Sequence, residues 1–489
     1  MSDTKNDLTT ILGKEKVLDS PEVLQAYSRD ESFVKPMKPR FVVKPGNADE
    51  VQKLVQWAGR EKTPLVPVSS GGPHFRGDTV PCVPEAVIVD LSGMKKILSV
   101  NKRHRMVVVE PGVTYGELLP VLEKEGMRIA MPLAPKATKS VITSLLEVEP
   151  RVTYRHQWNF VDPLRCTEVI FGDGQKMWTG EASGGPQDLD AQWKGDKWQI
   201  QGNGPGPTDF YRFLTAAQGS MGIVTWASIK CQELATIHKL YLVTAKKLSD
   251  LQAFVYRVMK LRFGDEVLLM NGAYLANLIG ETAEEIGKLK AKMPAWSALI
   301  GIAGYSILPE DRVEQQEGDI ADIAQQFGFT LESSAAGVPS QEILSKMLNP
   351  SGKTYWKQQY KGGFEDIFFL STLDKAPSFV SVMNSTAEEL SYPASDIGVY
   401  IQPVHLGTAW HIELSLPYSP DNTSEAALVK ELYLKASREL LKQGAFYSRP
   451  YGNWAELAFN QDAQAAKFLT KIKGIFDPSN IMNPAKLCC

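Results

Sequence analysis

The first part of the chain alternates short apolar strands with amphipathic helices, and this alternation restricts the fold more than any other feature. Apolar, strand-like segments followed by turn-forming residues occur at Phe41–Lys44, Leu65–Val68, Ala86–Leu91 and Met106–Glu110. Apolar residues return every three or four positions in Asp49–Arg60 and Thr114–Glu125, which predicts helices there. Strands that alternate with helices predict α/β units.

After about residue 235 the pattern changes to strands and longer helices that are typical of an antiparallel sheet. Strands are expected at Leu240–Ala245, Ser297–Tyr305, Val399–Val404 and His411–Leu416, and helices at 248–262, 310–327 and 426–443. Between the two patterns we predict a hairpin at 168–179, a long loop at 183–207 and a helix at 210–218.

The length of 489 residues is too great for one ordinary core. We therefore predict an α+β protein with several parts. They are an N-terminal helical segment at 1–35, a first domain at 36–235, a second domain at 236–440, and a C-terminal segment at 441–489 that returns to the first domain.

Composition argues against several classes of protein. The formal net charge of −3 gives no overall basic field for nucleic acid or an anionic membrane, although a local basic patch stays open. The five cysteines show no C-x-x-C pair and no zinc spacing, so we expect no iron–sulfur cluster. The N-terminus lacks the apolar core of a secretory signal, and no apolar run is long enough for a transmembrane helix. We expect a soluble, cytoplasmic protein, in which Cys488-Cys489 is a disordered bystander or a reactive or lipid-accepting tail.

Three segments rich in glycine, proline or asparagine are candidates for ligand contact. Ser69–Gly77 directly follows a strand, and its glycines would let backbone N–H groups approach a phosphate. In Gln218–Thr225, two glycines precede a β-branched strand, which would let the backbone lie flat against a planar ligand. Phe476–Pro484 contains two prolines and two asparagines that fix a rigid turn. Each segment alone also fits an ordinary turn, and none is a Walker loop or a G-x-G-x-x-G motif.

Taken together with three further segments, these turns resemble the vanillyl-alcohol-oxidase superfamily, whose flavin domain is also called the PCMH-type FAD-binding domain. The segments follow the family's order and are Val42–Val51, Pro67–Gly77, Val109–Val113, Glu168–Gly174, Gly219–Thr225 and Phe476–Pro484. The resemblance implies a two-subdomain FAD-binding domain at 36–235 and a substrate, or cap, domain with an antiparallel sheet and flanking helices at 236–440.

The resemblance also implies which residues bind FAD. It places the pyrophosphate against the backbone around Ser70–Gly77, Gly222–Val224 beside the cofactor and Asn483 near the flavin. The family's second glycine-rich segment corresponds to 135–141, which has no glycine, so hydroxyl groups are expected to replace some backbone contacts there. The predicted set is Pro67, Ser69, Ser70, Gly71, Gly72, Pro73, His74, Phe75, Pro111, Pro135, Thr138, Ser140, Thr143, Gly219, Gly222, Ile223, Val224 and Asn483.

Two details of this set were left open by the sequence. Lys136 or Lys139 either balances a phosphate or lies on the solvated surface. Some family members tether the flavin through a histidine in the first loop, which His74 could do, but Pro73 disturbs the alignment. We therefore expect FAD without a covalent link, with a link to His74 as the alternative.

Histidines supply the first candidates for catalysis. His156 falls in a segment that, in the family, runs beside the reactive edge of the flavin, where it is either a base for a substrate hydroxyl or a structural residue. His405 and His411 could approach each other across a turn, and Glu413 shares a strand face with His411. Two histidines that face the substrate without metal are the preferred interpretation. A metal site formed by His405, His411 and Glu413 is the weaker alternative.

A second cluster lies just before the C-terminal motif. Tyr447, Arg449 and Tyr451 could hold a carboxylate or a phenolate, because a guanidinium fork and phenolic donors suit such anions. An ordinary aromatic turn is the alternative.

These residues predict an FAD-dependent oxidoreductase, a dehydrogenase or oxidase, that removes a hydride from a hydroxyl-bearing or benzylic carbon. A para-substituted phenol or benzylic alcohol is the first substrate class, and a 2-hydroxy acid is the alternative. An electron-transfer subunit of a larger complex and a scaffold that has lost its cofactor also stay open. The expected partners are a small-molecule substrate, an electron acceptor (oxygen, a quinone, a cytochrome or an electron-transfer flavoprotein) and a second copy or larger complex, with no nucleic acid.

Overall fold

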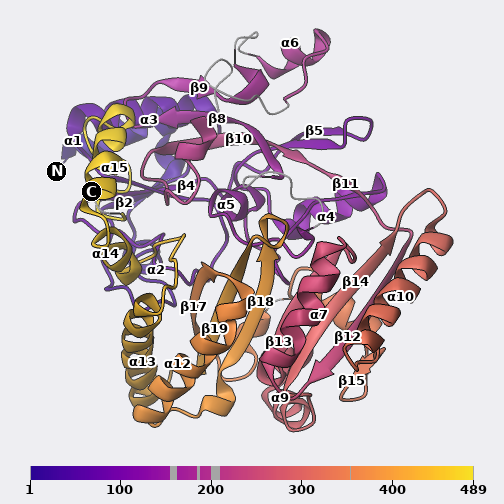
Figure 1. The fold of residues 1–489 in the computed structure, drawn as a ribbon. Helices are drawn as coiled ribbons and strands as arrows, with labels where there is room; N and C mark the ends of the chain where they lie inside the picture. Colours follow the sequence, from indigo (N-terminus) through magenta and orange to yellow (C-terminus); the bar gives the residue numbers. More distant parts are fainter. Residues whose placement is uncertain (1, 155–161, 184–187, 200–209, 353, 488–489) are drawn as a thin grey trace.

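Three larger β-sheets organise the molecule, two from the N-terminal half of the chain and one from the C-terminal half (Figure 1). The computed structural model describes residues 2–154, 162–183, 188–199, 210–352 and 354–487. The predicted α+β class is confirmed.

The first sheet has the strand order β1-β2-β4-β3 and is mainly parallel. Its strands are β1 (Val17–Leu18), β2 (Phe41–Val43), β3 (Leu65–Val68) and β4 (Val87–Asp90), with only β1 antiparallel. Helices α1 (Ser2–Leu12) and α3 (Ala48–Glu61) bury their apolar faces on one side of it, and α2 (Pro21–Ala26) packs on the other side through Leu24. Helix α3 begins where the Asn47 side chain accepts a hydrogen bond from Glu50 N at 2.9 Å. The predicted strands and the predicted α3 match within two residues.

The second sheet is antiparallel, with the order β5-β6-β10-β8-β9. Its strands are β5 (Ile97–Asn101), β6 (Met106–Val109), β8 (Leu164–Phe171), β9 (Lys176–Trp178) and β10 (Gly222–Lys230), and β7 (Met127–Arg128) pairs with β11 (Gln232–Glu233) beside it. Helices α4 (Tyr115–Lys124) and α5 (Val141–Leu146) pack in its core. The predicted hairpin is confirmed as β8–β9.

Two expectations for the region before β10 were wrong. The predicted helix at 210–218 is only one 3₁₀ turn, η4 (Phe210–Phe213), because Ala216 and Gln218 adopt positive φ angles of 55° and 52° that end any helix. The predicted loop at 183–207 contains helix α6 (Leu189–Lys194), which the Asp188 side chain caps.

The third sheet has six antiparallel strands in the order β12-β14-β13-β18-β19-β17. They are β12 (Ile237–Ala245), β13 (Glu266–Asn271), β14 (Trp296–Gly304), β17 (Gly363–Ser371), β18 (Gly398–Val404) and β19 (Ala409–Tyr418). The flanking helices are α7 (Leu248–Lys260), α8 (Gly272–Ile279), α9 (Ala283–Lys290), α10 (Pro309–Gln326), α11 (Ser340–Leu348), α12 (Ala376–Glu389) and α13 (Thr423–Lys442). Figure 1 shows this sheet below the other two. Helices pack on both of its faces, since alternate residues of its strands belong to two separate apolar clusters.

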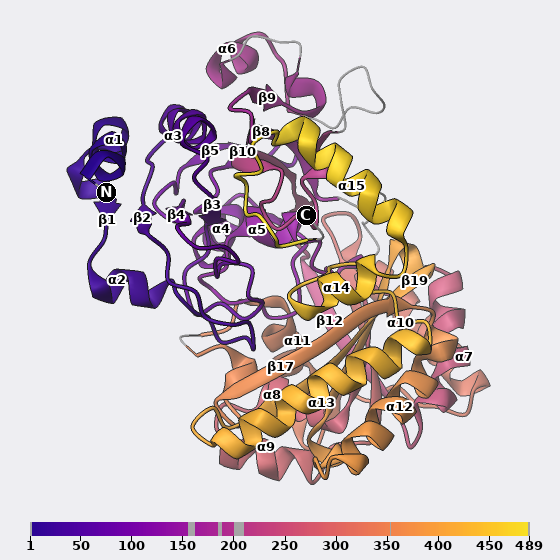
Figure 2. The same ribbon diagram turned by 90° about the vertical axis from the view of Figure 1, so that its left-hand side faces the viewer.

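The end of the chain lies against the first sheet. Helices α14 (Asn453–Phe459) and α15 (Ala463–Phe476) run back toward the N-terminal half (Figure 2). Leu65 N donates to Ile481 O at 2.8 Å, and Asn483 N donates to Leu65 O at 2.8 Å, so the tail continues beside β3. Within the described ranges, no helix is long and apolar enough to cross a bilayer.

Candidate active site

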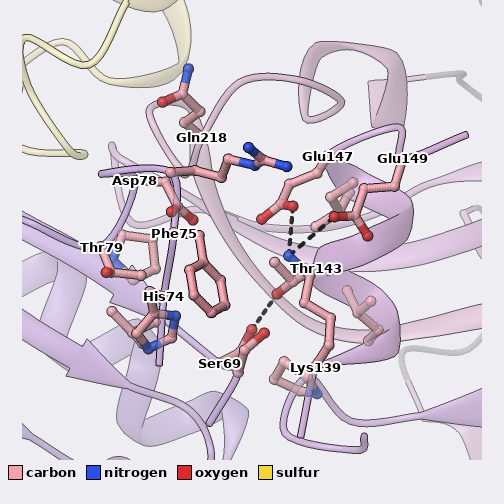
Figure 3. Close-up of a pocket in the computed structure, with 18 of the residues that line it drawn as sticks. Ser69, His74, Phe75, Asp78, Thr79, Lys139, Thr143, Glu147, Glu149 and Gln218 are labelled. Carbon is pink, nitrogen blue, oxygen red and sulfur yellow. Dashed lines mark hydrogen bonds and ion pairs between the residues drawn. The ribbon is translucent and has the colours of Figure 1, made fainter. Parts of the chain in front are cut away.

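A large cavity lies between the two N-terminal sheets and the third sheet. The empty space among its lining residues is about 1430 Å³, part of which is open to solvent. The wall is formed by residues of 67–79, 132–149 and 214–224 together with Leu91, Pro111, Tyr355, Phe364 and Tyr451. Figure 3 shows polar side chains from the first three segments that point into it. The strands β3 and β10 position two of these segments, since the segments lie where those strands end or begin.

Backbone contacts join the loop after β3 to the segment before α5. Gly71 N donates to Thr138 O at 3.0 Å, and a Cβ atom at Gly71 would lie 3.2 Å from Thr138 Cβ. Ser140 N donates to Ser70 Oγ at 3.0 Å, while Ser140 Oγ donates to the Pro111 carbonyl at 2.6 Å. Thr138 and Ser140 thus stabilise the loop after β3 from the side that faces away from the cavity.

The opposite wall needs glycine where β10 begins. Gly219 has a φ of +70°, and a Cβ atom there would lie 2.4 Å from Pro67 Cγ. At Gly222 a Cβ atom would lie 2.7 Å from the Ile170 carbonyl oxygen. At both positions the backbone is therefore packed directly against β3 or β8, which leaves no room for a side chain.

The C-terminal turn meets both of these segments. Asn483 Nδ2 donates to the Gln218 carbonyl at 2.7 Å, and Lys473, which is buried, donates to Ser220 O at 2.7 Å and to Met482 O at 2.9 Å. The C-terminal turn therefore packs behind the two turns that line the cavity, although more than 400 positions separate it from the first of them. None of the residues Phe476–Pro484 lines the cavity itself.

The structure distributes the predicted cofactor residues between the cavity wall and its support. The residues that line the cavity are Pro67, Ser69, Ser70, Pro73, His74, Phe75, Pro111, Pro135, Thr143, Gly219, Gly222, Ile223 and Val224. Gly71, Gly72, Thr138, Ser140 and Asn483 are not among the lining residues. Neither lysine in question is a solvated surface residue: Lys136 and Lys139 both line the cavity, and Lys136 donates to the carbonyls of Gly71 and Pro73.

The donor set of this cavity fits FAD. Among the described residues, the buried atoms Gln218 Oε1, Ser220 Oγ and Asn483 Oδ1 have no hydrogen-bond partner, and Gln218 lines the cavity. Hydroxyl groups and two lysines suit phosphate and ribose, and the flat backbone at Gly222 suits a planar ring. Burial lowers the pKa of His74 to about 4, so this imidazole is neutral in the cavity wall.

Two glutamates in the wall were missed by the sequence analysis. Glu147 and Glu149 follow α5, and both approach Lys139 Nζ, at 2.6 Å and 3.6 Å (Figure 3). Burial raises the pKa of Glu147 to about 7. Burial would also raise the pKa of Glu149, but Lys139 and the Ser144 hydroxyl outweigh it and hold that pKa below its ordinary value. The Glu-Val-Glu sequence at 147–149 was the only local sign of a paired-carboxylate site. Such a pair usually lies on a solvated surface, so the sequence alone did not single it out.

A smaller cavity of about 440 Å³ lies next to the first one, and we call it the inner pocket. It is lined by Val148, Glu149, Pro150, Arg151, Leu370, Val404, His405, His411, Ser448 and Arg449. Three of the predicted catalytic residues, His405, His411 and Arg449, therefore meet here. Burial lowers the pKa of both histidines, so both are neutral near pH 7.

Other predicted catalytic residues lie elsewhere. Tyr447 donates to the Ser437 carbonyl at 2.8 Å and stacks on Trp454, so its phenol packs against α13 and not in the inner pocket. Tyr451 lines the large cavity. His156 lies outside the described residues.

The weaker metal alternative finds no support in the described part of the chain. No group of three His, Cys, Asp or Glu side chains there could hold a metal ion. Glu413 accepts hydrogen bonds from Lys357 and from Tyr274, the latter at 2.7 Å, and its Oε2 lies 3.7 Å from His411 Nε2.

Residues 39–177 match the family model described as FAD binding domain. The chain carries an FAD-binding domain. This match covers the loop after β3 and the segment before α5, which form one side of the large cavity. FAD, when bound, supplies the redox chemistry by accepting a hydride.

Comparison with known proteins extends over nearly the whole chain. The chain is 21% identical to D-2-hydroxyglutarate dehydrogenase of Stutzerimonas stutzeri (strain A1501) over 99% of this chain and 98% of that protein. It is 20% identical to the flavoprotein subunit of 4-cresol dehydrogenase [hydroxylating] of Pseudomonas putida, over 97% and 93%. The crystal structure of p-cresol methylhydroxylase with substrate bound superposes with a TM-score of 0.82 at 18% identity and covers 99% of this chain and 96% of that one.

These comparisons confirm the resemblance to the vanillyl-alcohol-oxidase superfamily and its fold. The protein is an FAD-dependent oxidoreductase. The relatives include both phenol-oxidising flavoproteins and 2-hydroxy-acid dehydrogenases, and both groups are distant in sequence.

Proposed function

We propose that the protein removes a hydride from the hydroxyl-bearing carbon of a small anionic substrate, with FAD in the large cavity and the substrate in the inner pocket. A 2-hydroxy acid is the favoured class, and a para-substituted phenolate is the second. Arg449 gives the main support for an anionic substrate.

Arg449 is buried, and within the described ranges it forms no close ion pair. Its side chain lines the inner pocket and lies over the Phe368 ring at 4.0 Å, and none of the ion pairs among the described residues includes it. Glu149 lines the same pocket and attracts Arg449, but it does not form a close ion pair with it. A buried guanidinium without a close carboxylate is costly unless a ligand supplies the negative charge. Arg151, which is also buried, lines the same pocket. Two guanidinium groups favour a carboxylate, which accepts paired N–H donors.

The phenol alternative receives support from Tyr451, which lines the neighbouring cavity and could contact a substrate that bridges the two spaces. The position of Tyr447 against α13 removes one of the phenolic donors that made this alternative attractive in the sequence.

His405 and His411 are proposed to hold the substrate hydroxyl. A neutral imidazole both donates and accepts a hydrogen bond, so the pair can fix the direction of the O–H group while Arg449 fixes the anionic end. With both ends held, the carbon that loses its hydride has one position relative to the cofactor, and such positioning contributes strongly to the rate.

The cofactor assignments are part of this proposal. The lining residues of the predicted set would contact FAD, with hydroxyl groups and lysines near its phosphates and Gly222–Val224 against its ring. We also propose the division into a cofactor domain at 36–235 and a cap domain at 236–440, with the inner pocket between them. The absence of a covalent link to His74 remains a proposal as well.

Anaerobic mixing of the FAD-bound protein with a panel of 2-hydroxy acids and 4-alkylphenols tests the function. We expect 2-hydroxy acids to bleach the flavin, and the corresponding esters, which lack the charge, to fail. Arg449→Met should lower the second-order rate constant of bleaching on the order of 100-fold, because the buried charge pair with the substrate is lost. The exposed Arg438→Met serves as the matched control and should change nothing. If no member of the panel bleaches the flavin, the proposed function is wrong.

A further inference from the structure

Glu149 connects the two cavities. Among the described residues, it is the only one that lines both the large cavity and the inner pocket. Its carboxylate is therefore in a position to contact a substrate in the inner pocket while it belongs to the wall of the cofactor cavity. The neighbouring Glu147 lines the large cavity alone.

A hydrogen-bonded cluster holds Glu149 in place. The Ser144 hydroxyl donates to Glu149 and accepts from the Tyr115 hydroxyl at 3.0 Å. Lys139 Nζ lies between the two carboxylates and donates to Glu147 at 2.6 Å (Figure 3). Lys139 comes from the segment before α5 and the glutamates follow this helix, so the six residues of α5 set their separation.

We propose that the Glu147–Lys139–Glu149 cluster is the proton acceptor of the reaction, with Glu149 as the catalytic residue and Lys139 as a positioning residue. This inference rests on the proposed function. In the step, the substrate O–H bond breaks and an O–H bond forms on Glu149. The carbon loses its hydride to the bound FAD, and the substrate becomes a carbonyl compound that is oxidised by two electrons.

One lysine cannot fully compensate two carboxylates, and the cluster therefore takes up one proton readily. When a proton reaches Glu149, Lys139 is free to pair fully with Glu147, and the charge of the cluster changes from net negative to neutral. The raised pKa of Glu147 agrees with a cluster that binds one proton near neutral pH. The lowered pKa of Glu149 keeps this carboxylate in the charged form that can accept a proton from the substrate.

Charged and titratable groups from other elements also act on the cluster, and any test of pH dependence must keep them unchanged. They are Arg76, Asp78, Tyr115, Lys136, Arg151, Arg449 and Tyr451.

The first test needs no substrate. Infrared difference spectra of the FAD-bound protein, recorded as the pH is raised, should show a carboxylic C=O band that disappears near neutral pH. Lys139→Met should move this transition upward by about one pH unit or more, since the lysine favours both carboxylates in their charged form. Glu365→Gln is the matched control. Glu365 lies in β17 and is buried, and its burial raises the pKa of its carboxyl well above the ordinary value. The titrating band should therefore remain in the Glu365→Gln variant. The absence of a titrating band, or an unchanged band in Lys139→Met, would overturn the cluster.

The second test uses whichever panel member bleaches the wild-type flavin. Glu149→Gln, compared at equal FAD content, should slow flavin reduction about 10²-fold with little change in KM. The rate of flavin reduction in Glu149→Gln should depend less on pH. Glu149→Asp should restore part of the rate and part of its pH dependence. Reduction of Glu149→Gln at the wild-type rate would refute the role of Glu149. A wild-type flavin that no panel member bleaches would instead refute the proposed function and leave the infrared result to decide on the cluster.

Discussion

Lys473 provides the sharpest test of how the C-terminal segment closes the cofactor cavity. Its ammonium group is 3% exposed and donates to Asp477 Oδ2 at 2.7 Å, as well as to the carbonyls of Ser220 and Met482. Asp477, fully buried, also accepts from Ile481 N and Met482 N at 3.0 Å and 2.8 Å. The change Lys473→Met keeps most of the apolar volume and removes the only cation paired with Asp477 in the described residues.

The expected magnitude follows from the burial of the pair. Removal of one partner of a buried ion pair costs about 3–5 kcal/mol, because it leaves an uncompensated charge. For a cooperative unit of 150–250 residues, this loss lowers the melting temperature by roughly 6–20 °C. Because Lys473 also joins Ser220 to Met482 at the cavity wall, FAD affinity should fall together with stability.

Differential scanning fluorimetry and titration of the apoprotein with FAD measure the two effects. Lys471→Met, an exposed position two residues away in α15, is the control and should shift melting by less than the error of the method. Lys473→Met/Asp477→Asn should be more stable than Lys473→Met alone, since the unpaired charge is gone. Equal melting temperatures for the Lys473 and Lys471 variants would show that the pair does not hold the tail in place.

Three further results are expected. Gly219→Ala should weaken FAD binding at least about tenfold, because a Cβ atom would lie 2.4 Å from Pro67 Cγ at a φ of +70°. Fluorescence titration measures the affinity. The control is Gly474→Ala, where no atom lies within 4 Å of the added Cβ. Acid precipitation of the wild-type protein should release FAD into the supernatant, whereas a yellow pellet would mean that His74 or another residue is linked to it. Folding lowers the pKa of His74 from 6.5 to about 4, so the unfolded chain binds more protons between these pH values. Stability therefore falls as the pH drops below about 6.5. Melting curves at acidic and neutral pH should show a smaller loss of stability in His74→Asn.

The sequence by itself determined most of the local structure of the cofactor half. The strands at Leu65–Val68 and Met106–Val109 and the helix α3 depend on periodicity and on caps within a few residues, such as Asn47, and these signals are readable without tertiary context. The turn glycines were equally readable, because a positive φ or a close approach such as that of Gly219 to Pro67 admits only a residue without Cβ. The helix predicted at 210–218 was wrong. The apolar spacing there fits a helix, but positive φ angles at Ala216 and Gln218 turn the chain into β10.

Only the tertiary structure decided which polar groups face each other. Glu147 and Glu149 look like surface residues in the sequence, yet the packing of α5 buries them around Lys139. Arg449 and Tyr447 are two positions apart, but the backbone directs the guanidinium into the inner pocket and the phenol toward α13. Local patterns report how each residue prefers to fold with its neighbours in the chain. The direction of a side chain in a loop, and the charge it meets there, depend on segments hundreds of residues away, and for that reason the site had to be read from the fold.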